Sequence, residues 1–225
     1  MGQKVNPIGI RLGITRDWTS KWFAPKNKFA DLFLLDLDLE KTIRKELNAE
    51  GISTIEILRT QGKIIVDIHT AKPGLIIGRG GETIEKLKDS LKKKYNEVFT
   101  INIKEIKKPM LDAGVVGELI KLQIEKRISY RRAAKLALEK VIESGALGCK
   151  IYVGGRLNGV EISRSEFFSK GKIPLQTFRA DIDYSSTYAL MSYGKIGIKV
   201  WIYRGDIFKK DLEIRLKQHI EEIKQ

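Results

Sequence analysis

The sequence is poor in several residue types, and each shortage excludes a class of protein. Cys149 is the only cysteine among 225 residues, which excludes an internal disulfide framework and a cysteine-based metal site and indicates a reduced, cytoplasmic chain. The two histidines, His69 and His219, lie far from each other in sequence, so no catalytic cluster is evident. No apolar run approaches the roughly 18 residues of a membrane-spanning helix, and neither a signal-peptide core nor a myristoylation motif is found. These shortages predict a protein without metal, cofactor or membrane partner.

Acidic residues are the minority among the charged ones. The chain has 42 Lys and Arg against 28 Asp and Glu, which leaves a formal net charge of +14. A surface of this charge attracts polyanions, and nucleic acid is the leading partner. The hydrophobic fraction of 42% supports folded domains, and the length suits two of them.

Residues 1–35 are basic and irregular, and they predict an N-terminal arm that contacts RNA. Arginine and lysine meet phosphates while flat rings stack on bases, so Lys4, Arg11, Arg16 and Trp22 are candidate RNA contacts. The alternative is a solvated tail whose tryptophans fold back on the domain.

Residues 36–108 predict a first domain of helices and strands. Leu39, Ile43 and Leu47 have helical spacing, which indicates a helix from about 39 to 50 that stops at Gly51. Residues 52–60 and 63–70 alternate apolar and polar residues across a Gln61-Gly62 turn and predict two antiparallel strands. A helix around 84–91 and a strand over 98–106 follow, with a short helix before the glycine-rich turn.

That turn, Gly78-Arg79-Gly80-Gly81, is the most informative stretch of the sequence. Glycine lacks a Cβ, so its backbone can approach a sugar-phosphate chain closely, and the helix that begins near Glu82 points free N–H groups at a phosphate. Glu82 itself would repel a phosphate, although an acid in the first turn favours the helix. Thr83 stands where a dinucleotide-binding fingerprint needs its third glycine, and no phosphate-binding loop of an NTPase occurs. The turn therefore favours an RNA clamp over a nucleotide-hydrolysing site.

The element order with LIIGRGGETI at the joint resembles the type II KH domain over roughly residues 39–106. The resemblance implies a three-stranded sheet covered by helices. It also implies that Gly78, Arg79, Gly80 and Gly81 hold the backbone of single-stranded RNA while an adjoining groove receives the bases.

Residues 109–208 predict a second α+β domain, with two helices on an antiparallel sheet, and residues 209–225 predict a helical tail. The helices begin near Val115 and at Ser129, a candidate cap. The second helix carries Arg131, Arg132 and Lys135 within an arc of about 100°. Strands are expected over 150–153, 177–188 and 196–203, and their loops would present basic side chains: Arg156, Arg164, Lys170, Lys172 and Arg179.

Asp181 and Asp183 share one face of a predicted strand, as a pair of metal-binding carboxylates would. With Arg179 on the same face, an ion pair is the favoured interpretation.

Several long motifs resemble a second family across nearly the whole chain. The stretches MGQKVNPIGIRLGITRDWTSKWFA, IHTAKPGLIIGRGGE, SYRRAAK, GGRLNGVEISRSE and YGKIGIKVWIYRG are similar, in the same order, to the third family of bacterial small-subunit ribosomal proteins. The resemblance implies a constituent of the small-subunit head in the cytoplasmic ribosome, bound to ribosomal RNA and beside the messenger RNA entry. It implies that Arg131, Arg132 and Lys135, assisted by Arg127, help unwind structured messenger without an ATP site. It also implies ribosomal RNA contacts from the arm and from Arg156, Arg164 and Arg179, with the tenth and fourteenth small-subunit proteins as neighbours.

Two other interpretations remain open at this stage. A free-standing KH regulator explains the glycine turn and the charge, but it leaves the arm and the second domain without a role. An enzyme would need a catalytic constellation, and His69, His219 and Cys149 offer none. The sequence therefore predicts a protein that is not an enzyme.

Overall fold

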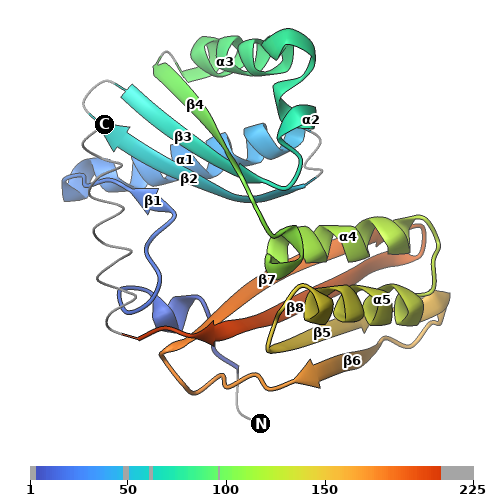
Figure 1. The fold of residues 1–225 in the computed structure, drawn as a ribbon. Helices are drawn as coiled ribbons and strands as arrows, with labels where there is room; N and C mark the ends of the chain where they lie inside the picture. The colour runs from blue at the N-terminus through green and yellow to red at the C-terminus, as the bar shows by residue number, and fades with distance from the viewer. Residues whose placement is uncertain (1–3, 48–50, 61–62, 96, 209–225) are drawn as a thin grey trace. The chain divides into compact units, whose positions relative to one another are not determined.

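The computed structural model describes residues 4–47, 51–60, 63–95 and 97–208, which form two compact units (Figure 1). The first unit covers residues 18–109, and the second combines residues up to Asp17 with those from Met110 onward. The predicted arm of residues 1–35 is thus divided between the two units. The predicted tail, 209–225, lies outside the described residues, as does the predicted Gln61-Gly62 turn.

The first unit has the element order that the sequence predicts. Its elements are β1 (Ser20–Lys21), α1 (Lys26–Glu46), β2 (Ile52–Thr60), β3 (Lys63–Thr70), α2 (Pro73–Ile77), the 3-10 turn η2 (Arg79–Gly81), α3 (Glu82–Tyr95) and β4 (Val98–Glu105). The strand order is β1-β2-β3-β4. Strands β2 and β3 are antiparallel, as predicted, and β3 and β4 are parallel. The short β1 adds a fourth strand that the sequence pattern did not indicate.

The core of this unit lies between the sheet and helices α1 and α3. Buried side chains from both helices pack with alternate residues of the strands, and they include Leu39, Ile43, Leu87, Leu91, Ile55, Ile57, Val66 and Ile68. The alternation that predicted the strands is therefore a burial pattern, since one face of the sheet is covered.

Helix α1 begins at Lys26, 13 residues before the predicted start. Its early apolar residues, such as Phe29 and Phe33, are half exposed. They therefore do not form a buried face whose helical spacing could be recognised in the sequence. Trp22 is fixed against this helix, because its indole N–H donates to Asp36 over 2.6 Å and its ring lies 5.3 Å from that of Phe29. This part of the predicted arm is ordered structure of the first unit.

The second unit is a two-layer α+β structure. It contains η1 (Gly9–Arg11), α4 (Ala113–Glu125), α5 (Tyr130–Glu143), β5 (Gly148–Gly155), η4 (Leu157–Gly159), β6 (Arg164–Gly171), β7 (Ala180–Met191) and β8 (Gly194–Asp206). The sheet is antiparallel in the order β6-β5-β8-β7. Helix α4 packs on β7 and β8, and α5 packs on β5 and β6, both on one face of the sheet (Figure 1).

The core of this unit fills the space between the helices and the sheet. It includes Ile120 and Ala134 from the helices and Ile151, Ile198 and Val200 from the strands. Cys149 is part of it, and burial raises the pKa of its thiol to about 12. This residue is the small buried thiol that suits a core position, and a neutral thiol is a poor nucleophile.

Two local features of the second unit differ from the sequence prediction, and one helix cap was not predicted. Strand β6 was not predicted, so Arg164 and Lys170 lie in a strand and not in loops. Ser129 stands at the N-cap of α5 but makes no side-chain capping bond there. The capping carboxylate belongs to Asp112, which accepts the N–H groups of Gly114 and Val115 at the start of α4.

Among the described residues, none of the helices is long and apolar enough to cross a membrane.

Candidate RNA-binding surfaces

The glycine turn between α2 and α3 has the backbone shape that only glycine adopts easily. Gly78, Gly80 and Gly81 have φ of 73°, 62° and 84°, in the left-handed region that a Cβ disfavours. A Cβ built on Gly78 would lie 2.1 Å from Thr83 Oγ1. Gly80 is exposed and has nothing within 4 Å of its Cβ position, so a second chain can approach the backbone there. Arg79 lies in the same turn, η2.

Glu82, the acid at the edge of this turn, is paired within its own helix. Its carboxylate contacts Lys86 Nζ over 2.5 Å, one helical turn further on, and the hydrogen bond from Lys86 lowers the pKa of Glu82. Because the pair is neutral in sum, Glu82 repels a phosphate less than an isolated acid would. The exposed lysines of the last turn of α3, Lys92, Lys93 and Lys94, restore a positive balance to the helix.

We expect Gly78→Ala to destabilise the first unit by about 1–3 kcal/mol, because the substitution forces a strained φ and a clash with Thr83. The matched control is Gly74→Ala in α2, where φ is ordinary and the Cβ position is open. That control should be neutral or stabilising, since alanine is the better helix residue. Urea unfolding of the full chain measures both, and equal midpoints for the two variants would contradict this account of the turn.

Helix α5 brings the predicted basic residues together on its exposed side. Arg131, Arg132 and Lys135 are all exposed, while Ala133, Ala134, Ala137 and Leu138 are buried. Arg127 lies just before the helix, in the α4–α5 turn, with a left-handed φ of 61°. Its side chain lines a hollow of about 410 Å³ together with Ser129, Tyr130 and Asn158. The predicted set therefore clusters at the start of α5.

Arg131 differs from its two neighbours because it is held by an acid. Its guanidinium donates to both carboxylate oxygens of Glu166 on β6, over 3.2 and 3.0 Å. The Tyr130 hydroxyl donates to the same carboxylate over 2.9 Å. The hydrogen bond to Glu166 raises the pKa of Arg131, and the bonds from Arg131 and Tyr130 lower that of Glu166. The pair fixes the direction of Arg131 but also occupies part of its donor capacity.

We therefore expect Glu166→Gln to tighten RNA binding at low salt by about two- to fivefold and to steepen the salt dependence by about one counterion. The substitution frees the Arg131 fork for a phosphate and removes one negative charge nearby. Glu139→Gln, on the exposed side of the same helix, removes the same charge without touching Arg131. Anisotropy titrations over a salt series test this, and equal effects of the two variants would mean that only net charge matters.

Two residues of the predicted arm serve the fold of the second unit. Arg11 is 1% exposed, and its guanidinium donates to the carbonyl oxygens of Pro7, Leu175, Thr177 and Ala180. Burial lowers its pKa. The prediction that Arg11 contacts RNA must therefore be corrected, because no donor-bearing face of this side chain reaches the solvent.

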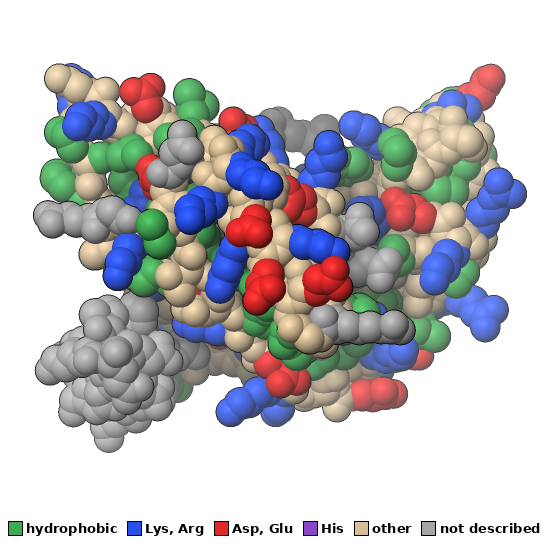
Figure 2. All heavy atoms as spheres, turned by 90° about the horizontal axis from the view of Figure 1, so that it is seen from above, with side chains coloured by type: hydrophobic (Ala, Val, Ile, Leu, Met, Phe, Trp, Pro, Cys, Tyr) green, Lys and Arg blue, Asp and Glu red, His purple; other side chains and the backbone are tan. Residues whose placement is uncertain are grey.

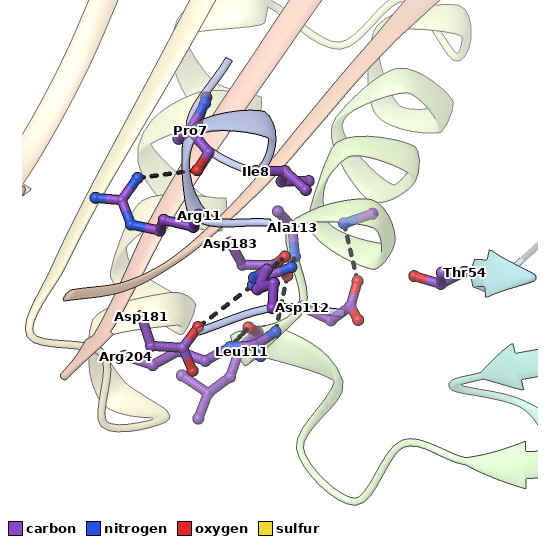
Figure 3. A network of polar contacts seen from close by, with 12 residues as sticks. Pro7, Ile8, Arg11, Thr54, Leu111, Asp112, Ala113, Asp181, Asp183 and Arg204 are labelled. Carbon is purple, nitrogen blue, oxygen red and sulfur yellow. Dashed lines mark hydrogen bonds and ion pairs between the residues drawn. The ribbon is translucent and has the colours of Figure 1, made fainter. Parts of the chain in front are cut away.

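Arg16 belongs to a cluster of ion pairs at the start of β7, of which Figure 3 labels Asp181, Asp183 and Arg204. It contacts Asp181 over 3.4 Å and Asp183 over 2.9 Å. Asp183 also accepts from Arg204 over 2.7 Å and from the Ala113 N–H over 2.8 Å. The two aspartates are thus ion-paired as expected, with Arg16 and Arg204, while Arg179 pairs with Asp206. No group of acids, histidines or cysteines in the described part of the chain is arranged to hold a metal ion.

The other side chains predicted to contact ribosomal RNA differ in their exposure and in how many of their donors are already bonded within the protein. Arg156 braces its own loop by donating to the carbonyls of Val160 and Tyr193. Arg179 is 62% exposed and pairs with Asp206 over 2.9 Å. Arg164 is 50% exposed with Glu166 at 3.9 Å, and Lys4 is exposed. Trp22 is half-buried and bonded to Asp36, so only part of its ring can stack on a base.

On the face that Figure 2 shows, the basic side chains of the described residues do not form a single continuous patch. Figure 2 shows Lys and Arg side chains spread across the face in view, with acidic side chains between them. Specific arrangements such as the glycine turn and the start of α5 therefore carry more information than the net charge.

A glycine turn that joins two helices on a mixed sheet is the arrangement of KH-containing RNA-binding proteins, and in this chain a basic helix on a second sheet follows it. Comparison with known families agrees, because residues 38–111 match the KH domain and residues 120–202 match the C-terminal domain of ribosomal protein S3. The chain is 52% identical over 207 residues to the small ribosomal subunit protein uS3 of Streptococcus thermophilus, with 92% of this chain and 95% of that protein covered. It is 51% identical to the uS3 protein of Pelotomaculum thermopropionicum over the same length, with 92% and 90% covered. The chain belongs to the uS3 family of small ribosomal subunit proteins, which are structural proteins and not enzymes.

Proposed function

We propose that the chain is a constituent of the head of the small ribosomal subunit in the cytoplasm, where it binds ribosomal RNA and lines the messenger RNA entry. Membership of the uS3 family supports the coarse part of this proposal. The net charge of +14 supports a polyanionic partner. The tenth and fourteenth small-subunit proteins are the proposed protein neighbours, on the basis of the family resemblance.

The exposed basic group at the start of α5 is the single observation that carries the messenger-entry role. Arg132 and Lys135 are exposed and have no carboxylate partner among the described residues, and Arg131 is aimed by Glu166. Cations presented side by side on one helix can bind the phosphates of a separated strand. The ribosome supplies the work of translocation, so the chain itself needs no ATP site.

The glycine turn and the free basic residues of the second unit are proposed as further RNA contacts. Gly78, Arg79, Gly80 and Gly81 would hold an RNA backbone, and Lys4, Arg164 and Arg179 would meet phosphates. Arg16, Trp22 and Arg156 would contribute only through the donors or ring surface that their internal partners leave available.

Crosslinking in assembled ribosomes tests the messenger-entry role directly. A messenger with 4-thiouridine placed downstream of the decoding site should crosslink to the peptide that contains α5 (Tyr130–Glu143). Crosslinks confined to other small-subunit proteins, at every position of the photoreactive base, would contradict the role. A free-standing KH regulator, the alternative, would crosslink to short RNA without ribosomes and would not be found in them.

A further inference from the structure

The second sheet has one face covered by helices and one face that carries rings and lysines. On β8, Ile196, Ile198, Val200 and Ile202 are buried, whereas Lys195, Lys199 and Trp201 are exposed or half-buried. The strand registers place the corresponding residues of the other strands beside them. We call this side the open face, and its residues are Lys150, Tyr152, Gly154, Ser165, Phe167, Ser169, Tyr184, Ser186, Tyr188, Leu190, Lys195, Gly197, Lys199 and Trp201.

The lysines of the open face lie over its aromatic rings. Lys150 Nζ is 5.0 Å from the ring centroid of Phe167 and 5.8 Å from that of Trp201. Lys195 is 4.8 Å from the ring of Tyr188, and Lys199 is 6.0 Å from that of Tyr152. Phe167 and Tyr188 remain 65% and 56% exposed. Rings on all four strands therefore lie beside cations that belong to β5 and β8.

The open face is also free of acids. None of its residues is Asp or Glu, and among the described residues its three lysines have no carboxylate partner. Lys4, from the N-terminal segment of the same unit, lies near Lys150. Burial and the charge of Lys4 both lower the pKa of Lys150. Neighbouring cations without a counter-charge favour the binding of an anion between them.

Two paired glycines leave a hollow of about 400 Å³ in the open face. Gly154 on β5 and Gly197 on β8 are register partners. The hollow is bordered by Tyr152, Lys199, Ser165 and Arg164. With no side chain at the floor, a flat group can lie against the backbone, with a ring and three polar or basic groups around it.

From these features we infer that the open face binds single-stranded RNA. Bases stack on the exposed rings of Phe167 and Tyr188 and enter the hollow over Gly154 and Gly197. The phosphates lie along Lys150, Lys195 and Lys199. Stacking platforms with interleaved cations suit single strands, because every base presents a π-face, whereas a duplex buries those faces.

This site is separate from the proposed messenger contact. Helix α5 packs on the other face of the same sheet, and Glu166, which holds Arg131, pairs in register with the buried Val153. The inference rests on family membership for the presence of RNA but not on the messenger-entry role. The affinity of the free protein for an unstructured RNA tests the open face, whereas the rate of translation through a hairpin tests α5.

The test uses the full chain with Arg131→Ala, Arg132→Ala and Lys135→Ala, so that the α5 surface does not contribute. The probe is a fluorescent 12-nucleotide RNA without secondary structure, titrated by anisotropy. Phe167→Ala with Tyr188→Ala should weaken binding about tenfold or more, since each stacked base contributes a factor of that order. The matched control is Val98→Ala with Leu147→Ala, which removes two exposed apolar side chains outside every proposed RNA contact and should change affinity less than twofold.

A second variant tests the open face without removing any aromatic ring. A Cβ on Gly197 would lie 3.7 Å from the Gly154 carbonyl, an ordinary contact without a strained φ, so Gly197→Ala should fold and yet keep a flat group off the backbone at the floor of the hollow. We expect it to weaken binding several-fold, and 4-thiouridine RNA should crosslink to peptides of β5 and β6. Affinities within twofold of the control, with crosslinks only outside this sheet, would overturn the inference. So would unchanged RNA affinity with a loss of another small-subunit protein from assembled subunits, because the open face would then be a protein contact.

Discussion

Ribosomes that carry Arg131→Ala, Arg132→Ala and Lys135→Ala should translate through a stable messenger hairpin several-fold more slowly than the wild type. The three cations are exposed on one side of α5, where they can hold the phosphates of the opened strand and slow its re-annealing. Removing them takes away about three phosphate contacts, and each contact contributes to strand affinity in a salt-dependent way. Unstructured messenger should be translated at nearly the wild-type rate, because no strand needs to be kept apart.

The control removes the same charge elsewhere. Lys92→Ala, Lys93→Ala and Lys94→Ala take three exposed lysines from α3 of the first unit, and this variant should pass the hairpin at the wild-type rate. Single-turnover translation of matched templates with and without the hairpin gives the ratio of rates. Equal ratios for the α5 variant and the wild type would reject the unwinding role.

Arg11→Met should lower the stability of the second unit by about 3–5 kcal/mol, which is the range for breaking a buried polar network. Methionine fills much of the space but leaves the carbonyls of Pro7, Leu175, Thr177 and Ala180 without their donors. Each unsatisfied buried acceptor costs about 1–3 kcal/mol when it cannot reach water. Thermal or urea unfolding of the free protein, without any RNA, measures the loss.

This measurement separates a structural arginine from an RNA contact. Arg179→Ala removes an arginine that is 62% exposed, and it should change stability by less than about 0.5 kcal/mol. If Arg11 bound RNA instead, Arg11→Met would have the same free energy of unfolding as Arg179→Ala and would lose only affinity for RNA.

Most of the first unit could be predicted from its sequence because its signals are local. The alternation over 52–60 and 63–70 matches β2 and β3 to the residue, since each strand has one covered face. The turn at Gly78 could be placed because a left-handed backbone needs glycine. The start of α1 could not, because Phe29 and Phe33 are half exposed and leave no buried stripe for a helical pattern to show.

The features of the second unit that escaped prediction depend on contacts between distant residues. Arg11 meets the carbonyl of Ala180, 169 residues away, and the Arg16–Asp183 pair is similarly remote. From the sequence alone, an arginine in a basic segment can equally well contact RNA or be buried in the core of the protein. Strand β6 was missed because its exposed face alternates Phe167 with serines, a pattern that lacks apolar repetition. The same strand supplies Glu166, which the basic run around Arg131 gave no reason to expect.

Sedimentation of cell extract through high salt tests the central claim most directly. An integral protein of the small subunit, held by many phosphate contacts and by neighbouring proteins, should remain with the small-subunit fraction after a high-salt wash. Recovery of the chain only in the light fractions, with retained affinity for short single-stranded RNA, would contradict the account and favour a free KH regulator.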